Sequence, residues 1–266
     1  MQYSRYIDQM KREVWIDSFP ERIISLVPSQ TEFLIELGLG SRLVGRTRFC
    51  IHPKEQVAAI PNIGGTKNLH LDQIRALKPD LIIGNKEENT REDIKILESE
   101  FPVWMSDVND FDAAVSMMLE LSQILQKQDT GQKICDELSK IKKEIESKAK
   151  RFAGFRVAYA IWKDPWMFAG RKNFIHSMLE LAGFENCIAA ERYPELQTEE
   201  IINLHPDYIF LSSEPFPFHG KHFEASKKAF PGETLKLVDG EAFSWYGSRL
   251  LHFSAYLDQL ESELKA

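Results

Sequence analysis

The sequence has few cysteines, no long apolar run and no cluster of basic residues. Its three cysteines, Cys50, Cys135 and Cys187, are too few and odd in number for a disulfide framework. No stretch approaches the roughly 18 consecutive apolar residues that a transmembrane helix needs. The polar N-terminal stretch contains no apolar core of a signal peptide, which predicts either a cytoplasmic protein or one whose leader was removed.

Several functional classes lack their sequence marks. The formal net charge of −7, without basic-aromatic arrays, disfavours a nucleic-acid partner. There is no Walker A loop, no G-x-S-x-G turn, no H-E-x-x-H pair and no Rossmann glycine fingerprint. The glycine-rich "IGGTKN" at 63–68 is too short to hold a nucleotide specifically. We therefore predict a protein that is not an enzyme and needs no cofactor.

An internal repeat is the strongest pattern that is present. "LHLDQIRALKPDLIIGNKEEN" at 69–89 aligns without a gap to "LQTEEIINLHPDYIFLSSEPF" at 196–216. Each copy predicts a short helix, a Pro-Asp break, a buried strand and a polar loop with a glutamate. A weaker similarity joins 33–45 to 177–189. Two copies of a helix-strand unit predict two related α/β lobes with mostly parallel sheets.

One long helix is expected to connect the lobes. Apolar residues at 134, 138, 141 and 145 form one stripe, and Asp129 or Thr130 is a suitable start for the helix. We predict an N-terminal lobe at 12–125, a linking helix at 126–151 and a C-terminal lobe at 152–266. A coiled-coil arm is the alternative for the helix, with weaker support from so short a stripe.

Four segments in a fixed order resemble one protein family. They are "RIISLVPSQTEFLIELGLGSRLVG" at 22–45, "ALKPDLIIGNKEEN" at 76–89, "FAGRKNFIHSMLELAGFEN" at 168–186 and "HPDYIFLSSEPFPF" at 205–218. The chain resembles the class III periplasmic-type substrate-binding proteins, which have a helical backbone and serve ABC importers. The resemblance implies a monomer of the periplasm or cell envelope that holds an iron chelate (siderophore or haem) or cobalamin between its lobes.

The resemblance also implies a partner and docking residues. In this family a glutamate on each lobe docks into arginine pockets of a permease dimer. The equivalent positions here are Glu214 and Glu87, with Glu88 as the alternative in the first lobe. We expect these carboxylates to stand exposed.

The ligand should lie at the carboxyl ends of the strands, where polar loops follow the buried segments. Those loops combine aromatic and basic side chains, which suit a flat, anionic ligand. Thr66 and Asn85 are polar where cobalamin-binding members have tryptophan, so cobalamin is one candidate beside an iron chelate or haem. The predicted ligand-binding residues are Arg48, Thr66, Lys67, Asn85, Lys86, Trp162, Trp166, Trp245, Tyr246 and Arg249.

Two alternatives stay open at this stage. A direct zinc or manganese receptor would need converging ligands, and "HGKH" at 219–222 or Cys50 with His52 has suitable spacing. We predict no metal site, because His70 and His205 lie on the helical side of the repeat, away from the cleft, and His219 and His222 resemble polar loop residues. A cytoplasmic binding or sensor protein of the same fold, without a transporter, is the other alternative.

Overall fold

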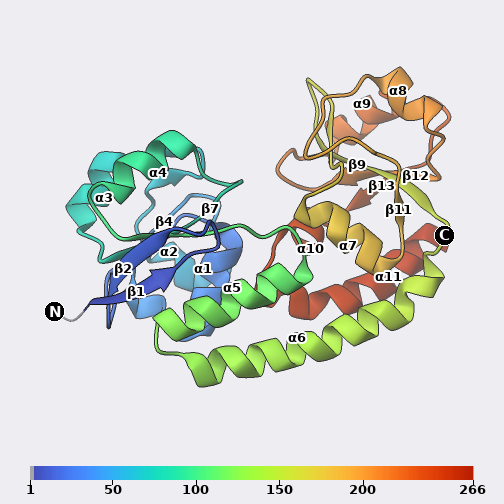
Figure 1. Cartoon of the computed structure of the whole chain (residues 1–266). Helices are drawn as coiled ribbons and strands as arrows, with labels where there is room; N and C mark the ends of the chain where they lie inside the picture. Colours follow the sequence, from blue (N-terminus) through green and yellow to red (C-terminus); the bar gives the residue numbers. More distant parts are fainter. Residues whose placement is uncertain (1–2, 266) are drawn as a thin grey trace. The chain divides into compact units, whose positions relative to one another are not determined.

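The computed structural model describes residues 3–265 as two compact units (Figure 1). Unit 1 contains the chain up to Val108, Asp112–Leu138 and Tyr246–Arg249. Unit 2 contains Asn109–Phe111, Ser139–Trp245 and the chain from Leu250 onwards. The long helix α6 (Gln128–Lys148) belongs partly to each, and the domain limits at 125 and 152 stay a prediction.

Unit 1 is built on a four-stranded parallel sheet in the order β4-β3-β7-β8. Every residue of β7 and β8 is buried, as expected for a parallel sheet covered on both faces. The strands are β3 (Ile23–Ser25), β4 (Leu43–Arg46), β7 (Leu81–Asn85) and β8 (Val103–Ser106), with the two-residue pair β5 (Gly64–Gly65) and β6 (Asn68–Leu69). The helices are α1 (Pro28–Glu36), α2 (Lys54–Ala58), α3 (Leu71–Leu77), α4 (Arg91–Glu98) and α5 (Phe111–Ile124).

Unit 2 has a five-stranded sheet in which β9 and β12 are central. Strands β11 and β12 run parallel to β9, β13 runs parallel to β12, and β10 is antiparallel to β9. The strands are β9 (Arg156–Trp162), β10 (Met167–Phe168), β11 (Glu185–Asn186), β12 (Tyr208–Ser212) and β13 (Leu235–Val238). The helices are α7 (Phe174–Ala182), α8 (Thr198–Asn203), α9 (Lys221–Ala229), α10 (Gly240–Ser244) and α11 (Phe253–Lys265). These sheets and the long helix confirm the predicted α/β fold.

The sequence repeat is also a repeat of structure. Strands β7 and β12 occupy equivalent positions in the alignment, and a left-handed residue follows each preceding helix within two residues of its end, Lys78 at φ 46° and His205 at φ 50°. The aspartates after the prolines have equivalent bonds. Asp80 accepts from the backbone N–H of Arg22 at 2.9 Å, and Asp207 from that of Arg156 at 2.7 Å.

The same two arginines close the ends of the helices. Arg22 Nε donates to the carbonyl of Leu77 at 3.0 Å, and Arg156 Nη1 donates to that of Leu204 at 2.8 Å. These carbonyls lie in the last turn of a helix, where they have no partner within the helix. We call each arrangement the Arg–Asp clasp: Arg22 with Asp80 in unit 1, and Arg156 with Asp207 in unit 2. The repeat therefore extends to β3 and β9, the parallel neighbours of β7 and β12, beyond the segments aligned in the sequence.

An N-terminal hairpin was not predicted. Strands β1 (Tyr3–Ile7) and β2 (Glu13–Asp17) pair antiparallel, and the side chains of Val14 and Ile16 in β2 are buried. The connecting turn lies on the edge of β8, where Gln9 N–H donates to the carbonyl of Met105 at 3.1 Å. The turn thus covers a sheet edge that would otherwise expose unpaired backbone groups.

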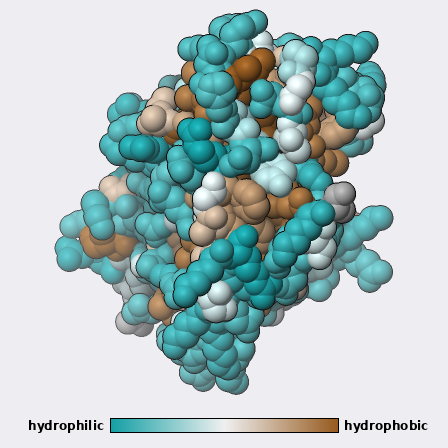
Figure 2. Space-filling view, turned by 90° about the vertical axis from the view of Figure 1, so that its right-hand side faces the viewer, coloured by the Kyte–Doolittle hydropathy of each residue, from teal (hydrophilic) through white to brown (hydrophobic). Residues whose placement is uncertain are grey.

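Figure 2 shows one face of the molecule, largely hydrophilic with smaller apolar patches.

Helix α6 begins at Gln128, slightly before the predicted start at Asp129 or Thr130. The predicted stripe is correct, since Leu138 and Ile145 are fully buried and Ile134 is half-buried. Helix α6 follows α5 after a short turn (Figure 1). The two helices approach closely at Gly131, because a Cβ atom there would lie 1.9 Å from Ser122 Oγ.

Replacing Gly131 tests this contact. Alanine favours helix by about 1 kcal/mol over glycine, but overpacking costs about 1–3 kcal/mol. We expect Gly131→Ala to lower the free energy of unfolding in urea titrations. The double variant Gly131→Ala, Ser122→Gly should recover part of the loss, because it removes the atoms that collide. A Gly131→Ala protein more stable than wild type would contradict the close approach.

Candidate functional site

The loop after β4 exposes apolar side chains around a buried thiol. Cys50 is 1% exposed, and its Sγ lies 3.1 Å from Thr31 Oγ1 and 3.2 Å from Thr47 Oγ1. Burial raises the pKa of the Cys50 thiol above its ordinary value, so it stays protonated. Phe49 and Ile51, on either side, are 46% and 47% exposed. These two residues were missed from the sequence, although their alternation with Cys50 could have marked them.

Two cations of unit 1, Arg48 and Lys67, remain available to bind an anion. The Arg48 guanidinium lies 4.9 Å from the centre of the Phe49 ring. Among the described residues it has no carboxylate within ion-pairing distance, and neither has the exposed Lys67. Arg48 N–H donates to the carbonyl of Gly64 at 2.8 Å, which holds the β4 exit loop against the turn that carries Lys67. This surface combines two positive charges with exposed apolar side chains.

Asn85 and Thr66 are buried and shape the loops. Asn85 is 1% exposed; its Nδ2 donates to Ser106 Oγ at 2.9 Å, and its Oδ1 accepts from the backbone N–H of Glu87 at 2.8 Å. Thr66 is 9% exposed, and its carbonyl accepts from Asn89 Nδ2 at 3.0 Å. Ligand contact by Thr66 and Asn85 stays a prediction, and their bonds show a role in holding the loops.

The loop after β7 carries three charged residues in a row. Lys86 Nζ pairs with Asp107 Oδ2 at 2.6 Å, so its charge is already partnered. Glu87 and Glu88 are half-buried, which is less exposed than expected for docking residues. Desolvation raises the pKa of Glu88, and the nearby charge of Lys67 offsets this in part.

The aromatic residues of unit 2 divide into core and surface. Trp166 stacks on Phe218 at 5.6 Å with an interplanar angle of 9°, against the buried core of the unit. Trp162 is 39% exposed and meets Phe216 edge-on at 5.4 Å. Of these two predicted residues, only Trp162 presents a substantial free surface; Trp166 is largely a packing residue.

Trp245 is held by Glu214. Trp245 and Tyr246 are each 5% exposed. The indole Nε1 of Trp245 donates to Glu214 Oε1 at 2.6 Å, and Ser244 Oγ lies 2.9 Å from the same oxygen. Glu214 is therefore half-buried and bonded within unit 2, where the sequence led us to expect an exposed carboxylate.

The charge of Arg249 is neutralised within unit 1. Its Nε and Nη2 donate to the two oxygens of Glu32 at 2.9 and 2.8 Å. Glu32 lies on α1 and is 8% exposed. The sequence assigned Arg249 to the ligand, but the structure shows a bidentate ion pair that fixes the segment Tyr246–Arg249 to α1.

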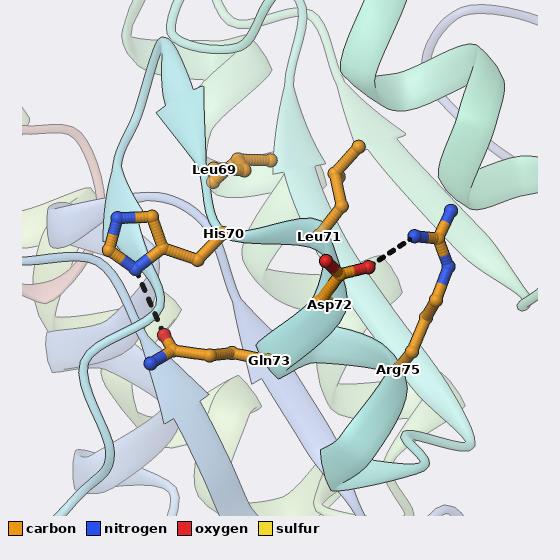
Figure 3. A pocket seen from close by; sticks show the side chains of 6 residues that line it. All are labelled: Leu69, His70, Leu71, Asp72, Gln73 and Arg75. Carbon is orange, nitrogen blue, oxygen red and sulfur yellow. Dashed lines mark hydrogen bonds and ion pairs between the residues drawn. The ribbon is translucent and has the colours of Figure 1, made fainter.

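Two open depressions have polar linings. Figure 3 shows one of about 580 Å³ in unit 1, where His70 Nδ1 lies 2.9 Å from Gln73 Oε1 and Arg75 pairs with Asp72 at 2.9 Å. The other, of about 500 Å³, lies in unit 2 and includes His176, whose Nε2 is 3.4 Å from Glu180 Oε2. These polar groups are paired with one another, and neither depression brings together the predicted ligand-binding residues.

Metal ligands do not converge in the part of the chain that the structure describes. No group of three histidine, cysteine, aspartate or glutamate side chains is arranged to hold a metal ion within residues 3–265. In the same residues, no helix combines the length and apolarity needed to cross a membrane.

The family is decided by a sequence comparison. The model of the family described as "Periplasmic binding protein" matches residues 23–233. The chain belongs to the periplasmic binding protein family. This periplasmic binding protein is 26% identical over 195 residues to the vitamin B12-binding protein of Vibrio campbellii, covering 72% of this chain and 70% of the relative. It is 28% identical over 213 residues to the uncharacterized ABC transporter substrate-binding lipoprotein YvrC of Bacillus subtilis, covering 76% and 67%.

Solved structures confirm the fold of this periplasmic binding protein. The haem-binding protein RhuT from Roseiflexus sp. RS-1, in apo form, has a TM-score of 0.79 at 21% identity, covering 92% of this chain and 97% of that one. The vitamin B12-binding protein BtuF of Vibrio cholerae has a TM-score of 0.75 at 22% identity, with coverage of 92% and 97%. The resemblance inferred from the four sequence segments is confirmed.

Breaking the pair of Arg249 and Glu32 should destabilise unit 1. Arg249→Ala leaves a largely buried carboxylate without its partner, so we expect a loss of about 2–3 kcal/mol in urea unfolding. Arg249→Lys should recover little, because an ammonium cannot form two parallel bonds. The double variant Glu32→Gln, Arg249→Gln should lose less free energy of unfolding than the summed losses of Glu32→Gln and Arg249→Gln measured singly. Strict additivity would show that the two side chains do not interact.

Glu88 should make stability depend on pH. Its pKa is raised in the folded protein, so the native state binds a proton more readily than the unfolded chain does. The free energy of unfolding therefore decreases as pH rises from the ordinary glutamate pKa through the raised one. Glu88→Gln should therefore stabilise the protein at neutral pH. The gain should shrink as pH falls through the raised pKa and vanish below the ordinary glutamate pKa of about 4.3. Urea titrations at several pH values would test this, with exposed Glu55→Gln as the control. An unchanged gain at low pH would refute the assignment.

Proposed function

We propose that this chain is the substrate-binding component of an ABC importer and binds a metal chelate reversibly, without chemical change. The ligand class is an iron siderophore, haem or cobalamin. Membership of the periplasmic binding protein family supports the role, and relatives named for vitamin B12 and haem support the ligand class. The proposed location is the cell envelope, and the proposed working state is a monomer.

The availability of Arg48 and Lys67 carries the ligand proposal. Within residues 3–265 neither side chain has an acidic partner at ion-pairing distance, whereas Lys86 and Arg249 do. An unpaired guanidinium and an ammonium can bind carboxylate or other anionic groups of a chelate. Phe49, whose ring faces Arg48, supplies an apolar surface for the flat part of such a ligand.

The other predicted residues divide into those that contact the ligand in this proposal and those that hold the loops. Trp162 and Phe216 offer aromatic surface from unit 2, and Lys163, 5.9 Å from the ring of Trp166, offers charge. The remaining residues act through the loops that they hold, namely Thr66, Asn85, Lys86, Trp166, Trp245, Tyr246 and Arg249.

A permease would recognise Glu87 or Glu88 in unit 1 and Glu214 in unit 2, because paired carboxylates on related loops suit a two-fold set of arginines.

Binding measurements test the proposal with three probes: hemin, ferric enterobactin and cyanocobalamin. We expect at least one to quench tryptophan fluorescence and raise the thermal stability. Arg48→Ala with Lys67→Ala should weaken the binding of an anionic probe about 10- to 100-fold, since each 1.4 kcal/mol is a factor of ten. Lys54→Ala with Lys95→Ala, which removes two exposed charges of unit 1, is the matched control and should leave the dissociation constant unchanged.

Two outcomes would contradict this proposal. Wild-type affinity in the Arg48→Ala, Lys67→Ala variant would show that these cations do not contact the ligand. If all three probes left fluorescence and stability unchanged while zinc or manganese shifted them, the chelate assignment would be wrong. Mass spectrometry of the molecule that co-purifies with the protein would identify the ligand directly.

A further inference from the structure

Two loops of unit 2 are joined at the carboxyl ends of neighbouring strands. Strands β12 and β13 are parallel partners, so the loops that follow them leave the sheet side by side. The N–H of Ser213 donates to the carbonyl of Val238 at 2.9 Å, and the N–H of Gly240 donates to Ser213 Oγ at 2.9 Å. These two bonds fix the start of α10 against the loop that carries Glu214.

Glu214 makes the side-chain connection between these loops. Its Oε1 accepts from Trp245 Nε1 at 2.6 Å and lies 2.9 Å from Ser244 Oγ. An indole N–H is a donor only, and a short bond to a carboxylate is among the stronger hydrogen bonds in proteins. Trp245 ends α10, and Phe243 two residues before it is fully buried against Tyr159 at 5.4 Å. One end of the loop is therefore anchored in the core, and Glu214 fixes the orientation of the next aromatic ring.

Gly240 leaves the space that Glu214 needs. A Cβ atom at position 240 would lie 2.7 Å from Glu214 Cγ and 2.4 Å from Ser212 Oγ. A larger residue would push the glutamate side chain away from Trp245. Three features thus converge on one arrangement: the bond to the indole, the contact with Ser244 and the gap at Gly240.

We propose that Glu214 is a positioning residue for ligand binding: by holding Trp245 it fixes the end of α10 and the orientation of the indole ring. This inference rests on the proposed function, in which Trp245 acts on ligand binding through the loop that it holds. The carboxylate acts here as a hydrogen-bond acceptor. This role differs from docking, for which its negative charge would matter. A glutamine, whose Oε1 accepts the same bonds without the charge, separates the two roles.

The test compares four variants with the tightest-binding probe among hemin, ferric enterobactin and cyanocobalamin. Glu214→Ala should weaken binding roughly tenfold, because the acceptor of the Trp245 hydrogen bond is lost. Trp245→Phe and Gly240→Ala should weaken it similarly, the first by removing the donor and the second by displacing the carboxylate. Glu214→Gln should keep wild-type affinity within about threefold. Exposed Glu199→Ala on α8 is the control.

A double variant and a ligand-independent readout complete the experiment. Glu214→Ala with Trp245→Phe should bind no more weakly than either single variant, since both remove one interaction. Solvent exchange of the Trp245 indole N–H, followed by NMR and assigned from its absence in Trp245→Phe, should accelerate about tenfold in Glu214→Ala but not in Glu214→Gln. This measurement needs no ligand, so it remains decisive if the proposed function fails.

The inference has clear contrary outcomes. Wild-type affinity and exchange in Glu214→Ala would show that the bond positions nothing. Equal loss in Glu214→Gln and Glu214→Ala would show that the charge of Glu214, and not its acceptor geometry, matters. If Glu214→Ala fails to fold, Trp245→Phe decides the question, because it keeps an aromatic ring in the same place. If no probe binds wild type but exchange follows the expected order, the proposed function fails and the positioning role stands.

Discussion

The Arg–Asp clasp is the interaction on which the rest of each unit depends. A parallel sheet requires the chain to cross over through a helix and return at a fixed height beside the first strand. In both units an arginine at the start of one strand (β3 or β9) binds the last turn of the helix before its parallel neighbour (β7 or β12), and the backbone N–H of this arginine donates to the aspartate that precedes that neighbour. The clasp thus sets the register of the two strands, and with it the edge at which their loops emerge.

Charge partnering then distinguishes the residues on those loops. Basic residues that look equivalent in the sequence have different surroundings in the folded chain. Lys86 and Arg249 are bound to Asp107 and Glu32, while Arg48 lies over an aromatic ring without an acidic partner among the described residues. An ion pair already formed must be broken before its cation can bind a ligand, which costs free energy that an unpaired cation does not lose. The availability of a charge, and not its position on a loop, is therefore the better guide to binding.

Local patterns made much of the fold predictable. The Pro-Asp breaks and the apolar runs after them gave β7 and β12 at their observed positions, because helix ends and buried strands depend on nearby residues. The pair of Arg249 and Glu32 joins residues 217 positions apart, and no local pattern specifies such a contact. The hydrogen bond of Trp245 to Glu214 likewise joins residues 31 positions apart. The hairpin was missed because its role, covering the edge of β8, appears only once the sheet exists.

The segment Tyr246–Arg249 has a consequence for how the chain folds during synthesis. Unit 1 consists mostly of residues before position 139, yet Glu32 receives its partner from position 249, 217 residues after it. Domains commonly fold in order as they leave the ribosome. Here α1 can pack on its sheet early, but it carries a largely buried carboxylate without its counter-charge until Arg249, 217 residues later, has been made. The unit whose residues are synthesised first is thus completed by a segment that follows most of unit 2.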